Sequence, residues 1–135
     1  ITVLNSSMLQ TQQATAAVAD GESYEAYSDA RLAELRENGQ AVFVNMTATW
    51  CITCLVNERV ALSSDTVEEA MADKQVTYLK GDWTNNDPAI TAVLKRYETS
   101  GVPLYLMFPA DPNMPAEVLP QLLTEGIILD ALERI

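Results

Sequence analysis

The chain has 135 residues, and its 8 Lys and Arg against 19 Asp and Glu give a formal net charge of −11 at pH 7. Such a charge argues against nucleic acid as a partner, because phosphate binding needs clustered Lys and Arg. The chain contains no His and only two Cys, so the usual ligands of a four-coordinate zinc site are missing and we expect no bound metal.

Residues 1–22 are rich in Ser, Thr, Gln and Ala and contain few large apolar side chains. We interpret them as a linker or loosely docked arm, followed by a single folded domain over residues 23–135. The chain begins at Ile1 rather than Met, which is typical of an excised domain or a processed product. No apolar run approaches the ~20 residues that a membrane-spanning helix needs.

The domain is predicted to alternate between helices and strands. Suitable helix N-caps are Ser28, Asp87 (followed by Pro88) and Thr124. The expected helices cover residues 28–37, about 51–62, 66–72, 88 to about 97, and 124–135, and the expected strands cover residues 41–44, 76–79, 104–108 and 117–119. Alternation implies a parallel sheet with covering helices, whereas the closely spaced last two strands imply an antiparallel hairpin. We therefore expect an α/β domain with a central mixed sheet between two helical layers.

The two cysteines, Cys51 and Cys54, form a Cys-x-x-Cys pair directly after the apolar run 41–48, where a strand is expected to lead into a helix. Thiols at this spacing can close a small reversible disulfide, and a helix N-terminus stabilises a thiolate. We expect Cys51 to attack a partner disulfide and the more buried Cys54, one turn further on, to resolve the mixed disulfide. The alternative is a static structural disulfide, although so short a loop constrains little of the chain.

Three segments resemble a known family. They are Val42–Leu62, which contains Trp50-Cys51-Ile52-Thr53-Cys54, then Gly81-Asp82-Trp83-Thr84-Asn85, and Ser100-Gly101-Val102-Pro103-Leu104-Tyr105. Together and in this order they resemble the C-terminal periplasmic domain of the DsbD family, including its ScsB-like relatives. The resemblance covers residues 24–135 and implies a thioredoxin fold, with a central mixed sheet flanked by helices on both faces.

The resemblance also implies a function, that of a protein-disulfide reductase. The domain would take electrons from a transmembrane domain of the same parent protein and pass them to a periplasmic thioredoxin-like or N-terminal domain. It would lie in the periplasm as a monomeric domain of an inner-membrane protein, with the Cys51–Cys54 disulfide as its only redox group and no cofactor. Two alternatives are a freestanding thioredoxin-like reductase or oxidant with its own substrates, and a binding module whose disulfide is structural.

The same resemblance points to residues around the cysteine pair. Pro103 is expected to be a cis-proline that faces the pair, so that the backbone at Val102 can pair with an incoming chain. Trp50 is expected to shield the disulfide and to shape the docking surface, unless it is an ordinary core residue.

Two polar residues near the cysteine pair can be compared with the family: Asn45 departs from its pattern and Glu58 keeps it. Asn45 occupies the position, six before the first cysteine, where the family carries a buried acid, and an amide cannot titrate. Glu58, one helical turn after Cys54, is retained, and its negative charge would raise the pKa of the cysteine pair unless it is merely a solvated surface acid.

Charge near the pair supports a hypothesis about its reactivity. From Ala41 to Asn57 the chain has no ionisable side chain except the two cysteines. Only the helix N-terminus would then stabilise a Cys51 thiolate, and Glu58 would oppose it. We expect a pKa of Cys51 near or above that of an ordinary thiol, which suits an electron donor.

Overall fold

The structure is a computed structural model that describes residues 24–135, so the arm expected over residues 1–22 lies outside the described part. Its centre is a five-stranded sheet in the order β1-β3-β2-β4-β5. The strands are β1 (Glu25–Ala26), β2 (Val42–Thr47), β3 (Thr77–Asp82), β4 (Leu104–Phe108) and β5 (Glu117–Val118). The first three in chain order run parallel, whereas β4 is antiparallel to both β2 and β5. The predicted mixed sheet is therefore confirmed.

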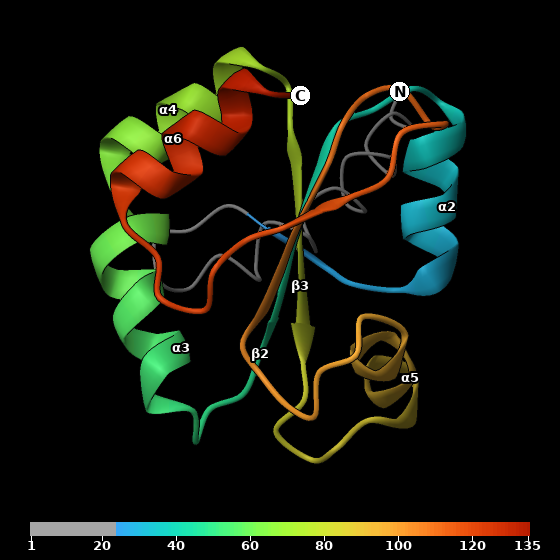
Figure 1. The fold of residues 1–135 in the computed structure, drawn as a ribbon, viewed down its shortest axis with the longest axis vertical. Coiled ribbons are helices and arrows are strands. Elements are labelled where there is room, and N and C mark those ends of the chain that lie inside the picture. The colour runs from blue at the N-terminus through green and yellow to red at the C-terminus, as the bar shows by residue number, and fades with distance from the viewer. Residues whose placement is uncertain (1–23) are drawn as a thin grey trace, which may run out of the picture.

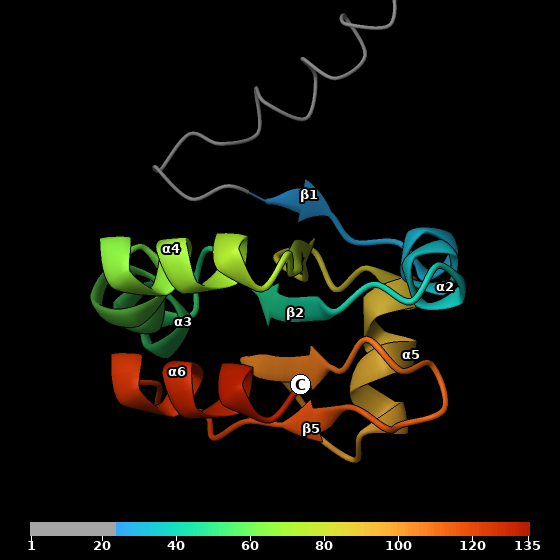
Figure 2. The same ribbon diagram turned by 90° about the horizontal axis from the view of Figure 1, so that it is seen from above.

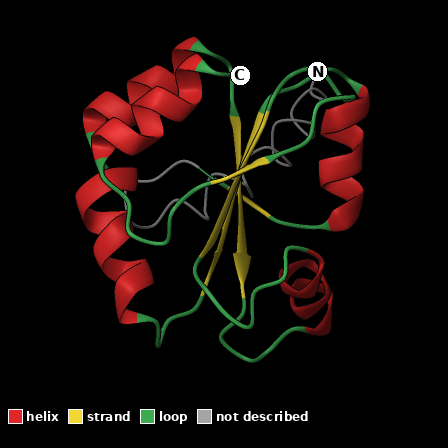
Figure 3. Cartoon of the chain, in the orientation of Figure 1, coloured by secondary structure: helices red, strands yellow, loops and turns green. Residues whose placement is uncertain are grey.

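Helices cover both faces of this sheet (Figures 1 and 2). One layer contains α2 (Asp29–Glu37) and α5 (Pro88–Arg96); the other contains α3 (Ile52–Asn57), the π-helical turn η1 (Glu58–Leu62), α4 (Asp65–Asp73) and α6 (Glu125–Glu133). The sheet lies between the two layers (Figure 3). This is the predicted architecture.

Side-chain caps fix where the helices begin. Ser28, Asp87 and Thr124 each accept a hydrogen bond from a backbone N–H of the first helical turn, as predicted. Ser64 does the same for α4. Gly39 follows α2 with a φ of 70°, a left-handed conformation that glycine adopts without strain.

The central strand β2 divides the hydrophobic core in two. All six of its residues are buried, and successive side chains point to opposite faces. Phe43 packs beneath η1, α4 and α6, whereas Val44 and Met46 pack beneath α2 and α5. Asn45 is fully buried on this strand, so its amide needs partners from the protein itself.

Several features differ from the predicted elements. Strand β2 ends at Thr47 and not at residue 44, and β3 ends at Asp82 and not at residue 79, because the pairing of the two strands continues that far. Strand β1 was not predicted, because two residues are too few to produce a strand periodicity; its pairing with Leu79 and Lys80 of β3 defines it. The helix expected over residues 51–62 has the predicted extent but changes from α to π geometry at Glu58, where the Ser63 N–H donates to the Glu58 carbonyl over 2.9 Å.

Candidate active site

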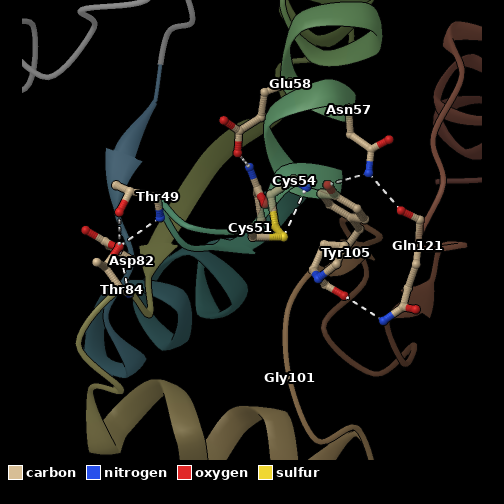
Figure 4. The surroundings of a disulfide bond; sticks show 12 residues. Thr49, Cys51, Cys54, Asn57, Glu58, Asp82, Thr84, Gly101, Tyr105 and Gln121 are labelled. Atoms are coloured by element: carbon tan, nitrogen blue, oxygen red, sulfur yellow. Dashed lines mark hydrogen bonds between the residues drawn. A yellow bond between two sulfur atoms is a disulfide. The ribbon is translucent and has the colours of Figure 1, made fainter.

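The cysteine pair lies where β2 passes into α3. Cys51 is the N-cap of α3, and its Sγ accepts a hydrogen bond of 3.1 Å from the Cys54 backbone N–H. The two cysteines form a disulfide with their Cα atoms 5.2 Å apart (Figure 4). One N–H of the first turn of α3, that of Cys54, therefore points at the sulfur of Cys51, and a hydrogen bond of this kind favours a thiolate.

The two sulfur-bearing residues differ in exposure. Cys51 is 6% exposed and Cys54 is 0% exposed. The neighbouring Ile52 and Trp50 are 75% and 55% exposed, so the pair lies at the surface beside two projecting apolar side chains. Of the two, only Cys51 therefore keeps a small exposed area, and the order in which the two thiols react stays a prediction.

The loop before β4 closes over the pair. The Val102–Pro103 peptide bond is cis, as predicted. The Val102 side chain packs against Ala48, Cys51 and Cys54. This loop and the start of α3 therefore form adjacent parts of one surface.

Trp50 is an exposed residue of this surface and not a core residue. Its indole Nε1 donates to the Thr84 carbonyl over 3.0 Å, and its ring lies 5.9 Å from that of Trp83. The Thr84 hydroxyl also accepts a hydrogen bond from the Thr49 N–H at 2.9 Å and contacts Asp82. The segment after β3 thereby holds the turn that precedes Cys51 (Figure 4).

Asn45 and Glu58 meet beneath the active-site helix. The Asn45 amide Nδ2 donates to Glu58 Oε2 at 3.2 Å and to the Tyr78 hydroxyl at 3.0 Å. The Asn45 Oδ1 is buried and has no hydrogen-bond partner within the described residues. The Glu58 side chain is only 15% exposed. The alternative that Glu58 is a solvated surface acid is therefore wrong.

A lysine near this site could not be recognised from sequence proximity. Lys80 Nζ lies 3.9 Å from Glu58 Oε1, and both side chains are largely buried. Lys80 reaches the site because it pairs with Asn45 in the β2–β3 register. A positive charge therefore lies beside Glu58, although no cationic residue is close to the cysteine pair in sequence. The expected pKa of Cys51 stays a prediction.

Two further polar residues near the pair, Asn57 and Gln121, were not predicted to belong to the site. Asn57, on the buried face of α3 and 2% exposed, bonds to Tyr105, Gln121 and Leu123. The Gln121 side chain bonds in turn to the Pro103 carbonyl. The available signal was an amide side chain three residues after Cys54, at a helical spacing that places both on one face.

Two absences complete the description of the site. Over residues 24–135, no His, Cys, Asp and Glu side chains gather in a group of three or more that could hold a metal ion. Within the same range, no helix is both long and apolar enough to cross a membrane.

A family model described as thioredoxin-like matches residues 23–110. The chain belongs to the thioredoxin-like family. Among solved structures, the oxidised C-terminal domain of DsbD from Neisseria meningitidis has the same fold, with a TM-score of 0.65 and 22% identity over 82% of this chain and 97% of that one. Chloroplastic thioredoxin z matches with a TM-score of 0.63 and 25% identity over 82% of this chain and 92% of that one.

Within the thioredoxin-like family, the sequence is similar to DsbD proteins. Thiol:disulfide interchange protein DsbD 1 of Pseudomonas aeruginosa is 39% identical over 80 residues, which make up 59% of this chain and 13% of that protein. DsbD of Escherichia coli K12 is 33% identical over 70 residues, or 52% of this chain and 12% of that protein. The chain thus spans a small part of these relatives. The similarity and the Cys51–Cys54 disulfide support the predicted class of enzyme, a protein-disulfide oxidoreductase.

Proposed function

We propose that this thioredoxin-like domain relays electrons to other proteins by dithiol–disulfide exchange at Cys51 and Cys54, and that it acts as a reductant. The observation that carries the proposal is the position of the pair. Cys51 sits at the start of α3 with some exposed surface, and Cys54 lies one turn further on with none. In this proposal the Cys51 sulfur reacts with a partner protein, and the Cys54 sulfur then reacts with Cys51.

The exchange balances with two electrons and two protons. The Cys51 thiolate attacks one sulfur of a partner disulfide, the partner's S–S bond breaks, and the departing partner sulfur takes up a proton. Cys54 then loses its proton and attacks Cys51 Sγ, which closes the internal disulfide and releases the second partner thiol. The domain is thereby oxidised and the partner is reduced. A donor dithiol then reduces the Cys51–Cys54 disulfide by the reverse steps and is itself oxidised to a disulfide.

The surroundings of the pair have supporting roles in this proposal. Val102 and Pro103 line the surface on which a partner backbone would rest, and Trp50 provides apolar contact beside it. Glu58, one helical turn after Cys54, and Asn45, which donates a hydrogen bond to it, are assigned a part in removing the proton of Cys54 during resolution. The largely buried Glu58 carboxylate makes thiolate formation more costly, and a less stabilised thiolate suits a donor.

The similarity to DsbD extends the proposal to partners and location. The electron donor would be a transmembrane domain of the same parent protein, and the acceptor a periplasmic thioredoxin-like or N-terminal domain. The domain would then reside in the periplasm, tethered through residues 1–22 to an inner-membrane protein. A freestanding reductase is the alternative, and the reading frame upstream of Ile1 distinguishes them: the relay requires encoded transmembrane helices, and their absence would favour the alternative.

Equilibration with glutathione tests the direction of electron flow. We expect a reduction potential near that of thioredoxin, about −270 mV, for a donor. A value near that of a strong oxidant, about −120 mV, would contradict the reductant role. A disulfide that neither glutathione nor a peptide thiol exchanges would instead identify a structural bridge and a binding module.

A further inference from the structure

A chain of hydrogen bonds, buried at Asn57 and partly buried at Gln121, joins the active-site helix to the loop that covers the disulfide. It begins at Asn57, whose amide Nδ2 donates to the Tyr105 hydroxyl at 2.9 Å and to the Gln121 carbonyl at 2.7 Å. The Asn57 Oδ1 accepts from the Leu123 N–H at 3.0 Å. The Gln121 side-chain Nε2 then donates to the Pro103 carbonyl at 3.2 Å. Figure 4 shows Asn57 and Gln121 bridging from α3 toward this loop.

The Asn57 side-chain amide uses both of its N–H donors and its oxygen in this bridge. Both of its donor hydrogens and one acceptor position are used by three hydrogen bonds, one to Tyr105 of β4 and two to Gln121 and Leu123 of the segment before α6. The side chain is 2% exposed, so water does not offer a ready substitute. An apolar side chain of similar size would fill the same space but would not fix these segments relative to α3.

Gln121 extends the bridge without being part of the core. It is an exposed residue, so filling the core does not account for its side chain. Its side-chain amide donates to the carbonyl of Pro103, next to Val102, which packs against the disulfide. A partner segment whose sulfur reaches Cys51 must lie against this loop, whereas a small disulfide need touch only Cys51.

We propose that Asn57 and Gln121 are positioning residues that hold the 101–103 loop in register with Cys51, and thereby favour polypeptide disulfides over small disulfides as substrates. This inference rests on the proposed exchange function. Asn57 anchors the bridge on the active-site helix, and Gln121 carries it to the loop. Neither side chain touches the reacting sulfur atoms in this role.

The test uses Gln121→Met in the 135-residue chain, because Asn57 is buried and its substitution risks unfolding. Methionine keeps the length of the side chain but cannot donate to Pro103. Gln40→Met is the matched control: Gln40 also donates its side-chain amide to a backbone carbonyl, that of Gln75, away from the cysteine pair. The reduced proteins react with a peptide that carries one disulfide and, separately, with hydroxyethyl disulfide.

We expect Gln121→Met to lower the ratio of the peptide rate constant to the small-disulfide rate constant by about fivefold, the effect of one net hydrogen bond. Gln40→Met should leave the ratio unchanged. An unchanged ratio in Gln121→Met, or an equal loss with both disulfides, would overturn the inference.

A second readout separates this inference from the proposed function. Amide hydrogen exchange at Gly101 and Val102 in the oxidised chain should be faster in Gln121→Met than in the wild type or in Gln40→Met. This result does not depend on catalysis. If the wild type reduced neither disulfide, the proposed function would fail, and unaltered exchange at both amides in Gln121→Met would separately overturn the bridge.

Discussion

Asn45 donates a hydrogen bond of 3.2 Å to the carboxylate of Glu58, one helical turn beyond Cys54. The other carboxylate oxygen of Glu58 lies 3.9 Å from Lys80 Nζ. An amide, a carboxylate and an ammonium group therefore share one largely buried site around Glu58. Asn45 contributes an amide and no charge to this site, and Glu58 is the carboxylate in contact with it.

Glu58→Gln should lower the pKa of Cys51 in the reduced domain. The substitution removes the negative charge of Glu58, and the positive charge of Lys80 is then no longer offset. Both consequences favour the Cys51 thiolate over the thiol. We expect the pKa to fall by about half to one pH unit, measured by thiolate absorbance. Glu117→Gln is the control, because Glu117 on β5 is also ion-paired, in its case with Arg134 at the end of α6. An unchanged or higher pKa in Glu58→Gln would contradict the assigned influence of Glu58.

Asn45→Asp should destabilise the domain in a pH-dependent way. A second carboxylate beside Glu58 would be desolvated and repelled, so the pKa of the new Asp would be raised in the folded state above its unfolded value. The variant then matches the parent below the unfolded pKa of about 3.9 and loses stability as the pH rises above it.

Urea denaturation measures this effect. At neutral pH the free energy of unfolding of Asn45→Asp should be lower than that of the parent by about 2 kcal/mol, with a much smaller difference at about pH 3.5. Asn113→Asp, on an exposed turn, should change little at either pH. A loss of equal size at both pH values would point to disturbed packing and not to a buried charge.

Trp50 and Trp83 are neighbours with different expected roles. Trp50 is 55% exposed, whereas Trp83 is partly buried against the core beneath α2 and α5. Trp50→Ala should lower the free energy of unfolding by less than about 1 kcal/mol and slow exchange with a peptide disulfide several-fold. Trp83→Ala should cost about 2–4 kcal/mol through lost packing. Unaltered peptide exchange in a folded Trp50→Ala domain would remove Trp50 from the docking surface.

Local signals predicted much of this fold. Strand β4 has its predicted bounds, Leu104 to Phe108, because a short apolar run between turn residues leaves few alternatives. The caps at Ser28, Asp87 and Thr124 were readable because capping depends on a single side chain and the next turn of backbone.

The missed features all depend on long-range contacts. Lys80 reaches Glu58 only through the β2–β3 register, and Asn57 bonds to Gln121 and Leu123, which lie 64 and 66 residues further along the chain. Strand β1 exists through its pairing with β3. The redox role of the cysteine pair could be predicted from the sequence, because it depends on the spacing of two nearby residues and on their position directly after a strand.

Trapping of a mixed disulfide tests the exchange mechanism most directly. The Cys54→Ala variant is mixed with a peptide that carries one disulfide, and Cys51→Ala serves as the matched control. We predict that mass spectrometry finds the peptide joined to Cys51 in the first variant, because no second thiol is present to release it, and no adduct in the second. An adduct only on Cys54, or none in the folded Cys54→Ala variant, would contradict the account.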